Sequence, residues 1–63
     1  MKYSELEKAI RQTTDCKLFR NGGRHPIWEN PDTGELFAMS YHVNEEVKSG
    51  TLKDIIKKSG VKL

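Results

Sequence analysis

The sequence predicts a small α+β domain of two layers, with two helices on one face of a three-stranded antiparallel sheet. Apolar residues recur at helical spacing in two segments, one near each end of the 63-residue chain. Between these segments lie three short apolar and aromatic stretches separated by turn sequences. A chain of this length forms one domain, residues 1–63, with a thin hydrophobic core.

The first helix is expected over residues 4–12. Ser4 and Glu7 have the spacing of a capping box, in which each side chain accepts a hydrogen bond from the other's backbone N–H. The apolar residues that follow one stripe of this helix are Tyr3, Leu6, Ala9 and Ile10. This stripe is expected to face the core.

Three strands are expected next. Their ranges are 16–20, 25–29 and 35–41, and the last two form a hairpin. The turn between these two contains Pro31, which suits a φ near −65°, and Gly34, which suits a positive φ.

The third strand has apolar residues on both of its faces. Leu36 and Ala38 lie on one face, and Phe37, Met39 and Tyr41 on the other. One face must pack against the helices, so the other is expected either to contact a partner or to be covered by the chain termini.

The second helix is expected to begin close to Ser49, after a polar loop over residues 42–48. Thr51 and Asp54 have capping-box spacing, and Ser49 is the alternative cap. The apolar stripe of this helix is Leu52, Ile55 and Ile56, and Gly60 marks its end.

Composition narrows the classes of function. The single cysteine, Cys16, is expected to be a buried hydrophobic residue, with a nucleophile as the alternative. Two histidines and one cysteine at uneven spacing match no zinc pattern, so we expect no metal and no small-molecule cofactor. No apolar run spans a membrane and no stretch is typical of a secretion signal, so a cytoplasmic protein is expected.

Positive charge gathers in two parts of the chain although the net charge is only +2. Lys17, Arg20 and Arg24 lie within residues 16–30, and four lysines lie within residues 49–63. Two basic segments that met in space would form a surface for a phosphate backbone. The alternative is that the lysines of the last helix serve solubility.

The segment Asn21 to Trp28, in the middle of the chain, contains residues suited to binding phosphate and to transferring a proton. Gly22 and Gly23 permit a sharp turn and a close approach of another backbone. Arg24 offers donors that fit phosphate oxygens, and His25 can exchange a proton near neutral pH. Pro26 favours an extended conformation at His25, which is therefore expected to open the second strand.

The order helix, three strands, helix is that of double-stranded-RNA-binding-domain-like folds. The segments that carry a closer resemblance are Arg20 to Trp28, Asn30 to Gly34, and Lys48 to Gly60. Together they resemble the HicA family, the mRNA-cleaving toxins (mRNA interferases) of type II toxin–antitoxin systems. The resemblance covers nearly the whole chain.

The resemblance implies that His25 is the catalytic histidine, because that family places it in a Gly-Ser-His motif at the start of the second strand. Here the motif is Gly23-Arg24-His25, so Arg24 replaces the serine. A second family histidine usually follows Pro-Arg, whereas here Ser40-Tyr41 precedes His42.

Roles for the other residues follow from charge and from the resemblance. The expected partners are mRNA and a HicB-like antitoxin protein. The residues expected to bind RNA are Lys17, Arg20, Gly23, Arg24, Lys53 and Lys57. The residues expected to contact the antitoxin are Trp28, Phe37, Met39 and Tyr41. Trp28 is alternatively a stacking platform for a base or a core residue.

Three functions remain open at this point. In the first, His25 acts as a general acid or base in metal-independent cleavage of mRNA, and His42 is either a second catalytic group or a loop residue. In the second, the chain binds structured RNA and cuts nothing. In the third, the chain is an interaction protein that uses the face containing Phe37, Met39 and Tyr41.

Overall fold

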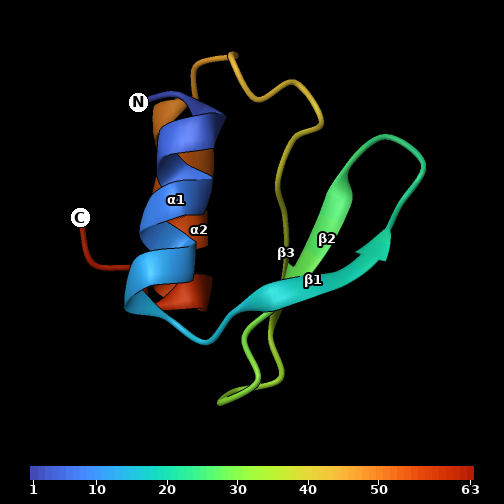
Figure 1. Cartoon of the computed structure of the whole chain (residues 1–63), viewed down its shortest axis with the longest axis vertical. Coiled ribbons are helices and arrows are strands. Elements are labelled where there is room, and N and C mark those ends of the chain that lie inside the picture. Colours follow the sequence, from blue (N-terminus) through green and yellow to red (C-terminus); the bar gives the residue numbers. More distant parts are fainter.

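The computed structural model describes residues 1–63 as a helix, three strands and a second helix. The bounds are α1 Tyr3–Thr13, β1 Lys17–Asn21, β2 Pro26–Glu29, β3 Leu36–Ala38 and α2 Ser49–Ser59. The strands form one antiparallel sheet in the order β1-β2-β3. Both helices lie on the same side of this sheet and run in the same direction (Figure 1). The predicted two-layer α+β fold is confirmed.

The core lies between the helices and the sheet face that is turned toward them. Trp28 of β2 and Phe37 of β3 pair across the sheet, and each is only 2% exposed. The other buried apolar residues are Tyr3, Leu6, Ile10, Cys16, Met39, Val47, Ile55 and Val61. Ile56, which was expected in the apolar stripe of the last helix, is exposed because the core takes only one side of α2.

The side chains of strand β1 are not buried in this core. All five of its residues are exposed, including Leu18 and Phe19. Its pairing with β2 shifts register between Leu18 and Arg20, which is where a bulge adds twist. β1 and the turn that follows it therefore extend away from both helices (Figure 1).

Helix α1 begins at Tyr3, one residue before the predicted start. The backbone N–H of Tyr3 donates to the carbonyl of Glu45 at 3.1 Å, and that of Ser4 donates to the carbonyl of Val43 at 2.8 Å. The predicted capping box of Ser4 and Glu7 does not form, because a loop far along the chain supplies acceptors for these helix-end amides.

Helix α2 begins at Ser49, close to the expected start, but its N-cap is Lys48, so the alternative cap Ser49 is wrong. Thr51 and Asp54 lie inside the helix, so their predicted capping box is wrong, and Asp54 instead pairs with the Lys58 ammonium at 3.2 Å. Gly60 ends the helix with a φ of 73°, as expected for a glycine that accepts the left-handed conformation.

Strand β3 is shorter than predicted. The ladder ends where the Met39 N–H donates to the Pro26 carbonyl at 2.9 Å. Beyond it the Ser40 hydroxyl accepts a hydrogen bond from the His42 N–H at 2.9 Å, and this local turn leads the chain away from the sheet.

The turn between β2 and β3 contains the predicted positive φ, 76° at Gly34. It is also attached to the end of α2. The buried Asn30 side chain donates to the carbonyls of Lys58 at 3.0 Å and Ser59 at 3.3 Å, which have no partner within the helix. This contact joins the sheet to α2 at the end of the molecule opposite the loop over residues 42–48.

No helix in the structure has both the length and the apolar character needed to cross a membrane.

Candidate functional site

His25 lies in the turn between β1 and β2 and is exposed. It does not open the second strand as predicted, because β2 begins one residue later, at the buried Pro26. The hairpin of β1 and β2 thus presents the histidine at its tip, where a large ligand can reach it.

The two glycines before His25 have different structural roles, and neither has a positive φ. A Cβ on Gly22 would lie 2.7 Å from the carbonyl oxygen of His25, whereas a Cβ on Gly23 would meet no atom within 4 Å. The turn folds back on itself at Gly22 and leaves open space beside Gly23. The sharp turn therefore needs no left-handed backbone at these glycines, and close packing is the reason for Gly22.

Tyr41 forms a hydrogen bond with this turn. Its hydroxyl donates to the Gly22 carbonyl at 2.7 Å. The contact is possible because Met39 is still bonded to Pro26, so the chain after β3 continues alongside the turn. Sequence reasoning missed this role, and only the register between β2 and β3 could have indicated it.

The hairpin that carries His25 is basic. Lys17 and Arg20 lie in β1 and Arg24 lies in the turn, and all three are exposed. No acidic residue occurs between positions 17 and 26; Asp15 precedes this range, and Glu29, directly opposite Lys17 in the sheet, follows it. The three cations and His25 thus share one hairpin, with Arg24 beside His25 in the turn and Lys17 at the end of β1 away from it.

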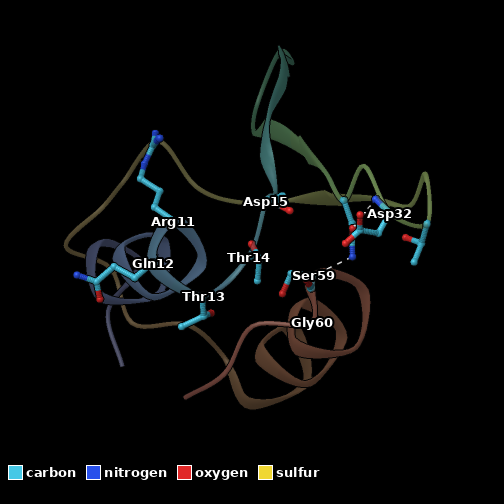
Figure 2. Close-up of a pocket in the computed structure, with 10 residues that line it drawn as sticks. Arg11, Gln12, Thr13, Thr14, Asp15, Asp32, Ser59 and Gly60 are labelled. Carbon is cyan, nitrogen blue, oxygen red and sulfur yellow. Dashed lines mark hydrogen bonds between the residues drawn. The ribbon is translucent and has the colours of Figure 1, made fainter.

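Lys53 and Lys57 lie elsewhere. Both are exposed on α2. The tip of the hairpin and α2 are on opposite sides of the molecule in two different views (Figures 1 and 2). The two basic segments of the sequence do not merge into one surface around His25.

His42 is exposed in the loop after β3. Its backbone carbonyl accepts a hydrogen bond from the Glu45 N–H at 3.0 Å, which orders the loop. It directly follows Tyr41, so the loop that bears His42 is attached to the turn that bears His25.

Most of the residues predicted to contact an antitoxin are core residues. Trp28, Phe37 and Met39 are each 2% exposed, because β2 and β3 turn these side chains toward the helices. Only Tyr41, 46% exposed, is accessible to a partner. The exposed sheet face instead carries Leu36 and Ala38.

Cys16 is buried, and its thiol donates to the carbonyl of Ser59 at 3.3 Å. This supports the interpretation of Cys16 as a packing residue at the start of the sheet. No three His, Cys, Asp or Glu side chains come together as a metal site would require.

The groups with shifted pKa values lie near the start of α1, away from the hairpin. The Glu46 carboxylate accepts a hydrogen bond from the Met1 ammonium at 2.7 Å, which raises the pKa of the amine and lowers that of the carboxyl. Burial, followed by the charge of Glu45, raises the pKa of the Tyr3 phenol.

The larger of two surface grooves lies where the C-terminal ends of α1 and α2 meet the turn after β2 (Figure 2). It has a volume of about 560 Å³, and every residue that lines it is polar or glycine. Arg11, Asp15, Asp32 and Gly60 are among them, and His25 is not. The groove is therefore separate from the basic hairpin.

The fold and the hairpin define a class: a very small α+β domain with an exposed histidine on a basic β-hairpin. The family model described as the HicA toxin of bacterial toxin–antitoxin systems matches residues 3–61. The chain belongs to the HicA toxin family. It is thus the toxin member of a toxin–antitoxin pair, and an antitoxin is its partner. No curated protein and no solved structure matched the chain.

Proposed function

We propose that this toxin is a metal-independent endoribonuclease that cleaves mRNA, with His25 as the proton-transfer group. The observation that carries the proposal is the exposed His25 at the tip of a hairpin with three cations and no acid between residues 17 and 26. Such a surface attracts a polyanion and places an imidazole against it.

The chemistry needs only a positioned acid or base and stabilising charge. The 2′-hydroxyl of RNA attacks the adjacent phosphorus, a new 2′-O–P bond forms, and the P–O5′ bond breaks. His25 accepts the 2′-hydroxyl proton or gives one to the leaving 5′-oxygen, which contributes about 10²–10⁴-fold to the rate. The products are a 2′,3′-cyclic phosphate and a 5′-hydroxyl.

The neighbouring cations bind and stabilise the reacting phosphate. Arg24 is next to His25 in the turn, and Arg20 lies near the end of β1, the strand that leads into this turn. Guanidinium groups donate paired hydrogen bonds to phosphate oxygens and offset the charge that grows on the phosphorane. Gly23, with open space at its Cα, allows the backbone of the RNA to approach the turn.

His42 is the candidate for the second proton transfer, because its loop is attached to the turn through the bond between Tyr41 and Gly22. The other interpretation is that His42 serves only the loop. A HicB-like antitoxin is proposed to inhibit the toxin by covering His25, with the exposed Tyr41 in its contact surface.

Growth of cells that express the protein tests the proposal, with His25→Ala as the variant that removes the imidazole. The native chain should arrest growth and co-expression of the antitoxin should restore it. His25→Ala should be harmless while keeping its circular dichroism spectrum and its antitoxin binding. A folded His25→Ala protein that still arrests growth would contradict the proposal and favour an RNA-binding module that does not cut.

A further inference from the structure

A second groove, of about 220 Å³, lies between α1, the β1–β2 hairpin and the loop after β3. Unlike the larger groove it has a mixed lining. Leu18 and Trp28 contribute apolar surface, while Glu7, Arg11, Asn21 and Tyr41 contribute polar groups around them. The Arg11 Nε–H donates to the Glu7 carboxylate at 3.4 Å. A small apolar groove with a few convergent polar groups is the usual form of a ligand site.

This groove opens beside the turn that carries His25. Asn21 and Pro26, the two residues that flank the turn, both line it. Tyr41 also lines it, and the Tyr41 hydroxyl holds the Gly22 carbonyl at 2.7 Å. A polymer with one phosphate at His25 can therefore place an adjacent unit in the groove.

Flat, exposed groups border the groove. The Arg11 guanidinium carbon lies 4.9 Å from the centre of the Trp28 ring, so the arginine covers the face of the buried indole. Arg11 and Tyr41 are themselves exposed. Unstacked RNA bases bind proteins by stacking on aromatic rings and guanidinium planes, and by hydrogen bonds to amide groups such as that of Asn21.

We propose that this groove binds one nucleobase of the RNA, next to the phosphate that lies at His25. The proposal rests on the proposed ribonuclease function for its substrate. The volume is below the ~300–1,000 Å³ of sites for drug-sized molecules, which suits a single base. A base held here would give the toxin a sequence preference at the cleavage position.

The only tryptophan of the chain lies in this groove, so its fluorescence reports directly on occupancy. The protein for the titration is His25→Ala, with each of the four nucleoside 3′-monophosphates as ligands and ribose 5-phosphate as the control without a base. At least one nucleotide should change the Trp28 emission saturably, and ribose 5-phosphate should not. Equal responses to nucleotides and ribose 5-phosphate, or no saturable response, would overturn the proposal.

Two cations on α1 provide a matched pair of variants. Arg11 lines the groove, whereas Lys8 is exposed on the same helix and does not. Arg11→Ala and Tyr41→Leu should each weaken binding of the preferred nucleotide at least about fivefold, the lower end of the effect of losing one stacking contact. Lys8→Ala should bind like the parent. Equal affinities for all four proteins would place the base elsewhere and overturn the proposal.

Failure here is distinguishable from failure of the ribonuclease function. If the native chain cuts mRNA and no nucleotide changes the Trp28 emission, the function stands and the nucleobase site is wrong. If nucleotides bind in the groove and the native chain cuts nothing, the site stands and the catalytic proposal is wrong.

Discussion

His25 is held in place by two uncharged neighbours. Gly22 packs against the carbonyl oxygen of His25, and the Tyr41 hydroxyl donates a hydrogen bond to the Gly22 carbonyl. The motif Gly-x-His could be recognised in the sequence, and it located the turn. The contact from Tyr41 could not, because the two residues are 19 positions apart and no local pattern links them.

Alanine at each of the two glycines tests how the turn is built. Gly22→Ala places a Cβ 2.7 Å from the His25 carbonyl oxygen, so the backbone must shift. We expect the free energy of unfolding to fall by about 1–3 kcal/mol and cleavage to fall with it. Gly23→Ala should change stability by less than about 0.5 kcal/mol, since nothing lies within 4 Å. Urea unfolding of both variants measures the difference, and equal stabilities would contradict this account.

Removal of the Tyr41 hydroxyl tests whether its hydrogen bond to Gly22 positions the turn that carries His25. Tyr41→Phe keeps the ring and loses one hydrogen bond to the Gly22 carbonyl. A bond of this kind is worth about 0.5–1.5 kcal/mol, so we expect kcat to fall about two- to tenfold while RNA affinity changes little. Single-turnover cleavage and a separate binding titration distinguish these effects. An unchanged kcat would show that Tyr41 does not position the turn.

At the scale of elements, the apolar patterns predicted all five helices and strands in the right order. Helix α1 starts one residue before its predicted start, and the N-cap of α2 is Lys48, three residues before the Thr51 that was predicted as a cap. At α1 the Glu5 carboxylate accepts from the Lys2 N–H, and carbonyls of the loop over residues 42–48 accept from the next two amides. The contacts with the loop have no local signature in the sequence. The exposure of β1 was likewise hidden, because Leu18 and Phe19 have the composition of a buried strand.

The start of α1 gives a pH dependence that can be measured. Burial raises the pKa of the Tyr3 phenol, so ionisation is harder in the folded protein than in the unfolded chain. The resulting stabilisation is complete below the ordinary tyrosine pKa of about 10 and is lost as the pH rises through the raised value.

Substitution at Tyr3 isolates this contribution. Tyr3→Phe keeps the buried ring, so its free energy of unfolding should fall less steeply than that of the parent above a pH of about 10. Urea unfolding across a pH series measures both slopes. Parallel curves for Tyr3→Phe and the parent would contradict the assignment.

At the scale of the whole molecule, the two basic segments face different regions of solvent. The hairpin of β1 and β2 extends to one side and α2 lies on the other (Figure 1). A net charge of +2 and a list of lysine positions could not show this, because proximity depends on how the layers pack. Our proposal places the RNA on the hairpin that carries His25, apart from α2.

The salt dependence of RNA binding compares the two surfaces. Each phosphate contact to single-stranded RNA contributes about 0.7 to the slope of log affinity against log salt concentration. Arg20→Ala in the hairpin should weaken binding and reduce this slope by about one contact, whereas Lys53→Ala on α2 should leave both nearly unchanged. A larger effect of Lys53→Ala would move the RNA to α2 and support the binding-module alternative.

The most direct test of the central claim is incubation of the purified chain with a long mRNA in the presence of EDTA, beside His25→Ala. The fragments and the chemistry of their 3′ ends are the readout. The account predicts fragments with 2′,3′-cyclic phosphate ends from the native protein and intact RNA with the variant. Equal cleavage by both proteins, or an RNA that is bound and left whole by the native chain, would contradict it.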